Sequence, residues 1–504
     1  MSFKPFSRDF ESNRISSIKS KRSQSALEYM MTYGWAILII VIVAVILYSM
    51  GIFNPAASIS SAVTGFSGLG SVTAQVIPNS GLVLILGNSI GYNIKITNIT
   101  ISLNGKTSNI TPNSIISVSS FGKFFIPFAS VSPSSSYSFS VKVYYTEPGQ
   151  VLPGPYVSTG VAYGTASSSL GYYQKIIITN SQISPTPAPF QQMINLSVSY
   201  GGWYSVTGMI APNYQNVEFF SSNGLAIPSW LENYSSSQFI YWIKLQNGIP
   251  ASSSVTVYIV YFPKSDNVLN NVNDGEAPQI PCGSTPTSIC SVYAEYDDGA
   301  NVFNFYDNFA GRTLDSNVWT TGGTNGTSGN FSGVIVDNGL MLIGNSFGYL
   351  TWIAGSGASD ARYQLNESVE AYGPQVNGGS IGFTNSPQST TPSNGSFLAC
   401  SNADNCYLIN SLNGATSTSL MGKFDVSGNY YVLTTTLTSV NTITSINYTF
   451  GKTLDSSDHT KQINGMYISL ADEGTSFTAH YQWIRARAYP PNGVMPVIIF
   501  GGLA

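Results

Sequence analysis

The chain has 504 residues, a length that predicts several domains. Hydrophobic residues make up 43% and charged residues 9% of the sequence, which excludes a disordered chain of the usual charged kind. The net charge is −4, and six of the 20 Lys and Arg residues lie in the first 23 positions, so the remainder has no basic surface suited to nucleic acid.

The N-terminal region changes abruptly from basic to apolar. Residues 1–22 are polar and carry the basic cluster, whereas no charged residue occurs from Tyr29 to Ile94. A helix over 24–48 would be about 37 Å long at roughly 1.5 Å per residue, enough to span a bilayer. The positive-inside rule places the basic side in the cytoplasm. We therefore expect a transmembrane helix at 24–54 with the rest of the chain outside the cell, and a plain membrane anchor is the simplest form of this prediction.

Residues 21–36, KRSQSALEYMMTYGWA, resemble the processing site of archaeal type IV pilin-like proteins, which carry a class III signal peptide. The resemblance implies that 1–23 is a cytoplasmic leader. A prepilin-type peptidase would cut after Ser23, which Arg22 precedes, and Gln24 would become the mature N-terminus. Ser23 departs from the family, in which Gly or Ala is commoner at this position.

The same resemblance gives Glu28 a role in assembly. A carboxylate one turn into an apolar helix is costly in a membrane unless it meets a partner. In the pilin family that partner is the free amine of a neighbouring subunit, so like subunits are expected partners. The alternative is that Ser25 and Glu28 form a capping box at the start of the helix, and the two roles are compatible.

Beyond residue 54 the sequence predicts a mainly β protein. Runs rich in β-branched and aromatic residues alternate with polar residues between Gly, Asn, Ser and Pro turns. We expect the N-terminal helix to be followed by three β-sandwich or jelly-roll modules. The first, at 58–165, looks like the small immunoglobulin-like domain of archaeal pilins.

The other two modules resemble different families. Residues 172–283 resemble extracellular β-modules of undetermined function. Within 290–492, the stretches FYDNF at 305–309 and LDSNVW at 314–319 look like the opening of concanavalin A-like lectin and glucanase jelly rolls, including laminin G-like domains. The WIRAR stretch at 483–487 resembles the strand that closes such tandems, although Gln482 stands where Asp is frequent, which weakens a metal role there.

Four cysteines form two closely spaced pairs, Cys282 with Cys290 and Cys400 with Cys406. In an exported chain this spacing favours two disulfides. A metal site is a poor alternative, because the spacing is not C-x-x-C and the only histidines, His459 and His480, are distant in sequence.

The chain also contains nine N-x-S/T sequons, a number that its richness in Asn, Ser and Thr favours by chance. In an exported archaeal glycoprotein several could carry glycans. The candidates are Asn98, Asn109, Asn195, Asn233, Asn325, Asn330, Asn366, Asn394 and Asn447.

The sequence argues against an enzyme. Two histidines leave little room for Ser-His-Asp or Cys-His chemistry. The jelly-roll hydrolases carry a Glu-x-Asp-x-x-Glu cluster on one strand, and the nearest match, at 295–300, lacks the last Glu and precedes the domain opening. We expect this match to be an acidic inter-domain loop. The isolated acids of the module are expected in solvated turns: Glu367, Glu370, Asp472 and Glu473.

We expect no cofactor other than a calcium ion, which the lectin resemblance allows. Its candidate ligands are Asp297, Asp298, Asp307 and Asp337, and the alternative is that Asp307 and Asp337 only serve turns and strand ends. Sugar binding would need exposed aromatic faces, whereas Trp319 and Trp483 are expected in the core. The aromatic candidates in this module are Tyr349, Trp352, Tyr363, Tyr372, Tyr407 and Tyr430.

These features together predict a cell-surface, pilin-like adhesion or structural protein in the membrane or in a filament. Its expected partners are the membrane, the prepilin-type peptidase, like subunits and a carbohydrate ligand, with no nucleic acid. The alternatives are a surface glycoside hydrolase and a purely structural envelope protein.

Overall fold

The computed structural model describes residues 37–39, 41, 61–197, 208–235, 238–282, 292–323, 333–343, 350–355, 366–373, 379–385, 395–400, 405–412, 414–423, 431–439, 441–448, 450–455, 467–473 and 478–503. Arg22, Ser23, Gln24 and Glu28 therefore lie outside the described residues. The described positions of the apolar run, 37–39 and 41, are helical. No helix within the described part of the chain has both the length and the apolar character needed to cross a membrane.

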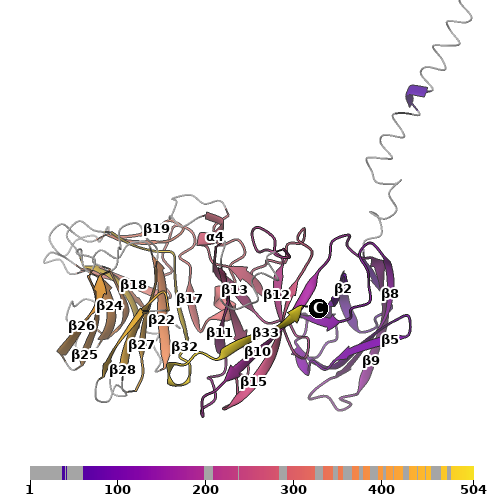
Figure 1. The fold of residues 1–504 in the computed structure, drawn as a ribbon, viewed down its shortest axis with the longest axis horizontal. Coiled ribbons are helices and arrows are strands. Elements are labelled where there is room, and N and C mark those ends of the chain that lie inside the picture. The colour runs from indigo at the N-terminus through magenta and orange to yellow at the C-terminus, as the bar shows by residue number, and fades with distance from the viewer. Residues whose placement is uncertain are drawn as a thin grey trace, which may run out of the picture.

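The described chain is mainly β, as predicted, and its strands form a row of three units (Figure 1). We call them the first, middle and large sandwich. In the first sandwich, strict alternation along β8 buries Tyr137, Phe139 and Val141 and exposes the serines between them. One sheet has the order β1 (Ala62–Thr64), β9 (Tyr156–Thr165), β8 (Ser136–Thr146), β4 (Ile94–Leu103), β5 (Lys106–Ile110), with β6 (Ser114–Ile116) also paired to β4; the other comprises β2 (Leu69–Ile77), β3 (Gly81–Asn88) and β7 (Phe121–Pro127).

The middle sandwich consists of two four-stranded sheets and includes the last strand of the chain. One sheet has the order β12 (Val217–Ser221), β15 (Ser253–Tyr261), β10 (Tyr172–Asn180), β33 (Val497–Leu503). The other has the order β11 (Phe190–Ser197), β14 (Gln238–Leu245), β13 (Ser229–Tyr234), β16 (Asp274–Glu276). The yellow strand β33 runs back beside β10 (Figure 1). The large sandwich is thus inserted between β16 and β33 of the middle sandwich. The predicted domain boundaries at 283 and 492 did not include this insertion.

The large sandwich has two antiparallel sheets around one apolar core. The six-stranded sheet has the order β17 (Phe305–Asp307), β32 (Trp483–Ala488), β22 (Glu367–Gly373), β27 (Tyr431–Leu437), β28 (Asn441–Ile446), β29 (Phe450–Asp455). The seven-stranded sheet has the order β18 (Trp319–Gly323), β21 (Leu350–Gly355), β30 (Tyr467–Glu473), β23 (Gly379–Thr384), β24 (Gly395–Cys400), β25 (Asn405–Leu412), β26 (Ala415–Lys423). A small third sheet contains β19 (Val334–Val336), β20 (Leu340–Ile343) and β31 (Thr478–Tyr481).

Short helical turns occur where the units meet: α4 (Gln279–Cys282), α5 (Gly299–Val302) and the 3-10 turn η3 (Pro491–Gly493). The first and middle sandwiches share an apolar contact in which Phe125 packs against Tyr173, Phe220 and Tyr258. Beside it, Lys123 Nζ lies 2.6 Å from the buried carboxylate of Glu218. The contact combines buried rings with a buried ion pair, so the two units are packed together rather than loosely tethered.

Candidate functional site

The joint between the middle and large sandwiches is built around Arg485 of β32, which is fully buried. Its Nη2 lies 2.6 Å from Oε2 of Glu232 in the middle sandwich and 2.7 Å from Oε2 of Glu370 in the large one. The guanidinium carbon also lies 4.5–5.2 Å from the ring centres of four aromatic residues, which supply cation–π attraction. These residues are Trp230, Trp242, Phe303 and Trp483.

The two glutamates of this joint have the spacing of a glycosidase pair but not its environment. Because both lie within 2.7 Å of one nitrogen, their carboxylates come within about 5 Å, the separation of retaining glycosidases. Burial alone would raise the pKa of Glu370, but the guanidinium groups of Arg487 and Arg485 outweigh it and hold that pKa below its ordinary value. The general acid of a glycosidase must bind a proton and face solvent, and Glu370 does neither. The pair therefore contributes to packing. The expectation that Glu367, Glu370 and Asp472 lie in solvated turns was wrong, because all three are buried in strands β22 and β30.

The acidic stretch before the large sandwich also belongs to the joint. Asp297 accepts hydrogen bonds from Trp230 Nε1 of the middle sandwich and from Tyr306 Oη and Asn308 Nδ2 of the large one, at 2.6–2.8 Å. Asp298 is 1% exposed, and burial followed by the charge of Asp297 raises its pKa well above the ordinary value. The predicted acidic inter-domain loop does connect the two units, and of its aspartates Asp298 is buried and Asp297 is half-buried.

The four aspartates predicted to bind calcium make separate interactions in the structure. Asp307 accepts hydrogen bonds from Trp319 Nε1 and from the backbone of Phe309, while Asp337 lies near the exposed Arg312, 3.7 Å away. Within the described residues, no three His, Cys, Asp or Glu side chains are placed to hold a metal ion. Among these residues the four aspartates form no assembled site, and calcium binding stays a prediction. Asp307 is the last residue of β17.

One face of the seven-stranded sheet carries the sugar-binding candidates that the structure describes. Core residues such as Leu398 and Leu408 alternate with residues of the opposite face, which the strand register places in line across the sheet. We call this line the aromatic row: Trp352, Ala471, Ser380, Ala399, Tyr407 and Leu420. Small side chains in its middle separate the indole of Trp352 from the phenol of Tyr407, and Leu420 is 52% exposed.

The other aromatic candidates lie elsewhere in the chain. Tyr372 stacks on Trp483 inside the joint, with ring centres 5.7 Å apart and planes 9° apart. Tyr349, Tyr363 and Tyr430 lie outside the described residues. Trp319 and Trp483 are buried, as predicted. In Figure 1, β24, β25 and β26 lie at the end of the molecule opposite the middle sandwich, so the aromatic row belongs to the sheet that this sandwich does not cover.

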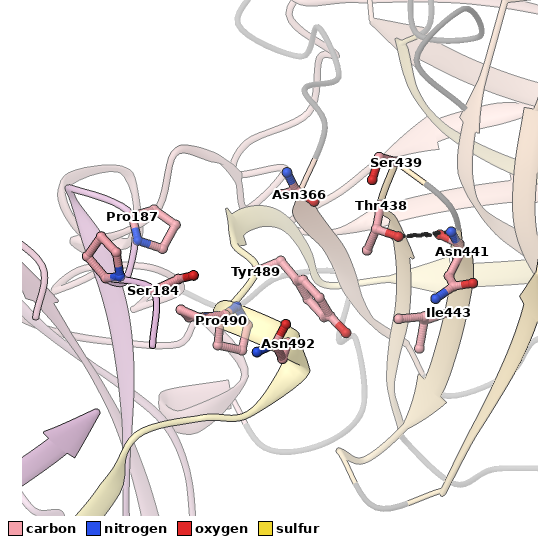
Figure 2. A pocket seen from close by; sticks show the side chains of 12 residues that line it. Ser184, Pro187, Asn366, Thr438, Ser439, Asn441, Ile443, Tyr489, Pro490 and Asn492 are labelled. Carbon is pink, nitrogen blue, oxygen red and sulfur yellow. Dashed lines mark hydrogen bonds between the residues drawn. The ribbon is translucent and has the colours of Figure 1, made fainter. Parts of the chain in front are cut away.

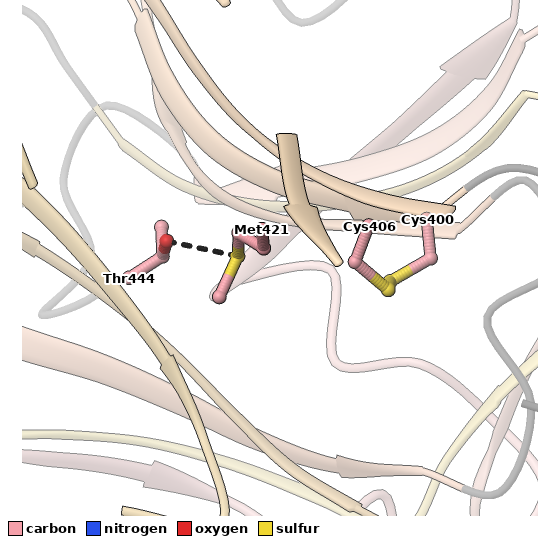
Figure 3. Close-up of a disulfide and its surroundings, with 4 residues drawn as sticks. All are labelled: Cys400, Cys406, Met421 and Thr444. Carbon is pink, nitrogen blue, oxygen red and sulfur yellow. Dashed lines mark hydrogen bonds between the residues drawn. A yellow bond between two sulfur atoms is a disulfide. The ribbon is translucent and has the colours of Figure 1, made fainter. Parts of the chain in front are cut away.

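A disulfide joins Cys400 of β24 to Cys406 of β25, directly opposite one another in the sheet. Figure 3 shows it with Met421, whose sulfur accepts a hydrogen bond from Thr444 Oγ1 at 3.1 Å. Cys282 is also disulfide-bonded, and its expected partner Cys290 lies outside the described residues. The bond at Cys400 fixes the end of the hairpin that carries Tyr407.

The sequons differ in accessibility. Asn98 and Asn195 are half-buried, and Asn325, Asn330 and Asn394 lie outside the described residues. The exposed candidates, where a glycan would meet solvent, are Asn109, Asn233, Asn366 and Asn447.

Comparison with known proteins gives limited likenesses. No protein-family model matches the chain. Among curated proteins, "Uncharacterized protein 562" of Sulfolobus islandicus rod-shaped virus 1 is 37% identical over 155 residues, which are 30% of this chain and 24% of that protein. The match thus spans about a quarter of the relative's length.

Solved structures similar to about a third of the chain are carbohydrate-active proteins. They include the catalytic domain of an endo-1,3-β-glucanase from Thermotoga petrophila RKU-1 (11% identity, 36% of this chain, 96% of that chain, TM-score 0.28) and a Bacillus licheniformis β-glucanase (14%, 36%, 97%, 0.28). The carbohydrate-binding module CBM66 of Bacillus subtilis is also similar (15%, 34%, 98%, 0.25). At these identities and TM-scores, the likenesses carry no conclusion about what this chain binds or cleaves.

Sequence reasoning missed the role of Arg485. Its WIRARA strand alternates two arginines with apolar residues, which resembles a half-exposed strand, yet all six residues are buried. Two arginines in one apolar strand are a signal in themselves, because each needs an acidic partner when it is buried. Glu232 and Glu370 are 253 and 115 positions away, so no local pattern identifies them.

Proposed function

We propose that the protein is a cell-surface protein, anchored through its N-terminal helix, whose large sandwich binds neutral glycans without cleaving them. The observation that carries this proposal is the aromatic row. It presents Trp352 and Tyr407 on either side of small side chains, on the sheet away from the rest of the molecule.

The chemistry of this face suits a sugar. Flat aromatic rings offer large apolar contact areas, and binding sites combine them with a few polar groups that set orientation. The row itself contains no charged side chain, and neither does the parallel line of Gly382, Phe397, Ile409 and Thr418 on one side of it. On the other side, among the side chains that the structure describes, the only charged one is Lys423, at the sheet edge opposite Asn405. A neutral glycan is therefore favoured over an acidic one.

We propose that the protein does not cleave its glycan, because the acids described here already bind other groups of the protein. Glu370 is held by two arginines, Asp297 by hydrogen-bond donors from both sandwiches, and Glu367 accepts a hydrogen bond from Asn304 at 2.7 Å. Each of these acids is committed to packing. The alternative of a surface glycoside hydrolase has no observation in its favour among the described residues.

The anchoring part of the proposal rests on the sequence. Residues 21–36 carry the pilin-like processing motif, and the helix that follows would hold the chain in the membrane or in a filament of like subunits. The glycan-binding end would then project from the cell surface and mediate adhesion.

The binding part is tested by affinity electrophoresis of residues 61–504, expressed together, in gels containing neutral polysaccharides such as β-glucans, mannans and galactans. We expect retardation by at least one polysaccharide and its loss in Tyr407→Ala, since stacking on the half-buried ring of Tyr407 would disappear. Tyr163→Ala, which removes an exposed tyrosine of the first sandwich, is the matched control and should keep the retardation. Absence of retardation by every polysaccharide, or retention in Tyr407→Ala, would overturn the proposal.

A further inference from the structure

A pocket of about 520 Å³ opens where the middle and large sandwiches meet (Figure 2). This volume lies within the roughly 300–1,000 Å³ typical of small-molecule sites. The pocket is separate from the aromatic row, because its walls come from the loop before β11, the β27–β28 hairpin and the segment leading to β33. Its lining residues are Ser184, Pro185, Pro187, Asn366, Thr438, Ser439, Asn441, Ile443, Tyr489, Pro490, Pro491 and Asn492.

Hydrogen bonds hold the walls in place. The backbone N–H of Tyr489 donates to Asn366 O at 2.7 Å, and the N–H of Asn366 donates to Leu437 O at 3.0 Å. Across the junction, Asn492 Nδ2 donates to Gln182 Oε1 of the middle sandwich at 2.9 Å. The pocket is therefore formed before any ligand binds, which lowers the entropic cost of binding.

The lining is polar without being charged. Asn366, Asn441 and Asn492 provide amides, while Ser184, Thr438, Ser439 and Tyr489 provide hydroxyls. Burial raises the pKa of Tyr489, although Arg487 opposes the shift, so its hydroxyl stays protonated at neutral pH. The remaining wall is apolar, because it consists of four prolines and Ile443.

This combination selects a class of ligand. An ion would find no opposite charge, and a purely apolar molecule would cover amides and hydroxyls without hydrogen-bonding them, at a cost in free energy. A sugar ring offers hydroxyls at its rim and apolar C–H groups on its faces, which match the amides and the prolines.

We propose that this pocket is a second saccharide site, which takes a neutral unit of one or two rings and contacts both sandwiches at once. It does not depend on glycan binding at the aromatic row. Because the ligand touches Ser184 of the middle sandwich and Asn441 of the large one, it would also stabilise the junction that Arg485 holds on the inside.

The test is calorimetric titration of residues 61–504, made in a host without N-linked glycosylation so that the sequon residue Asn366 stays unmodified. The probes are neutral monosaccharides and disaccharides of glucose, mannose, galactose and N-acetylglucosamine. Ser439→Trp fills the pocket from an exposed position, and Tyr489→Phe removes one hydroxyl while keeping the ring. Ser138→Trp, on an exposed position of β8, is the matched control.

We expect at least one saccharide to bind, with affinity reduced at least tenfold by Ser439→Trp, reduced by Tyr489→Phe and unchanged by Ser138→Trp. Affinity should also be unchanged by Tyr407→Ala, which separates this site from the aromatic row. Binding that Tyr407→Ala abolishes and Ser439→Trp leaves intact would overturn the second site while supporting the first. Absence of binding to the whole panel would also overturn it.

Discussion

At the scale of single residues, Arg485 links the two larger sandwiches. Its charge is neutralised by Glu232 from one and Glu370 from the other, and Glu232 Oε2 also accepts hydrogen bonds from Trp242 Nε1 and Tyr448 Oη, both at 2.6 Å. A buried ion pair of this kind adds little net stability compared with apolar packing. Its value lies in specificity, because any other docking of the two sandwiches would leave buried charges unpaired.

Substituting Arg485 should therefore lower stability much more than the small net contribution of its ion pairs suggests. We expect Arg485→Ala to lower the free energy of unfolding by about 3–5 kcal/mol, because the buried carboxylate of Glu232 loses its ion-pair partner and that of Glu370 keeps only Arg487. Arg312→Ala, at a position 73% exposed and 3.7 Å from Asp337, should change stability by less than about 0.5 kcal/mol. Denaturant unfolding followed by tryptophan fluorescence measures both, and equal small effects would contradict the assigned role of Arg485.

Glu276 should make stability depend on pH. Burial, followed by the charges of Asp297 and Glu295, raises its pKa from 4.5 to about 7. Between these values the unfolded chain loses the proton while the folded chain keeps it, so stability falls as pH rises through this window and stays low above it. We expect the loss in Tm between about pH 5 and pH 8 to be smaller in Glu276→Gln than in the wild type. An identical loss in both proteins would contradict the raised pKa.

At the scale of elements, β33 is the strand that closes the middle sandwich after the chain has built the large one. Ile498, Phe500 and Leu503 pack against the core of the middle sandwich, whereas Ile499 faces solvent and is 56% exposed. The register with β10 pairs Ile178 with Ile498 and Ile177 with Ile499. Neighbouring isoleucines on this strand therefore have opposite environments.

This alternation gives a matched pair of substitutions. Ile498→Ser should destabilise the middle sandwich by about 1–3 kcal/mol, because it removes apolar contacts and places a hydroxyl among apolar side chains. Ile499→Ser should be nearly neutral. Limited proteolysis would compare them, with faster cleavage expected only for Ile498→Ser; equal sensitivity would mean that β33 does not close the sheet.

The sequence predicted the individual strands far better than it predicted which strands pair with one another. Alternation identified strands such as β8 and β15, since a strand with one buried face has a local signature. The return of β33 to β10 was not predictable, because it depends on a pairing across more than 300 residues. Among the six aromatic candidates, only the strand register places Trp352 and Tyr407 in one row and Tyr372 in the joint.

At the scale of the whole molecule, the three sandwiches form a row in which each neighbouring pair shares a packed interface (Figure 1). Ring contacts and Lys123 hold the first interface, and Arg485 with its aromatic cage holds the second. Such a row keeps the distal sheet at a fixed distance from the start of the first sandwich. This arrangement suits a protein that presents a binding face away from a membrane.

The N-terminus gives the matching prediction for anchoring. If the pilin-like motif is processed, N-terminal sequencing of protein purified from its own membranes should begin at Gln24, and Glu28→Ala should abolish filaments if they form. A chain that still carries residues 1–23 would instead leave a plain membrane anchor. A start near residue 55 would contradict the anchoring helix altogether.

Binding of a neutral glycan without cleavage can be tested in a single sample. Residues 61–504 are incubated with the polysaccharide that retards them, and bound protein and newly formed reducing ends are measured in the same sample over time. We expect stable binding with no increase in reducing ends above the protein-free control. A steady release of reducing ends, or the absence of any bound polysaccharide, would contradict this expectation.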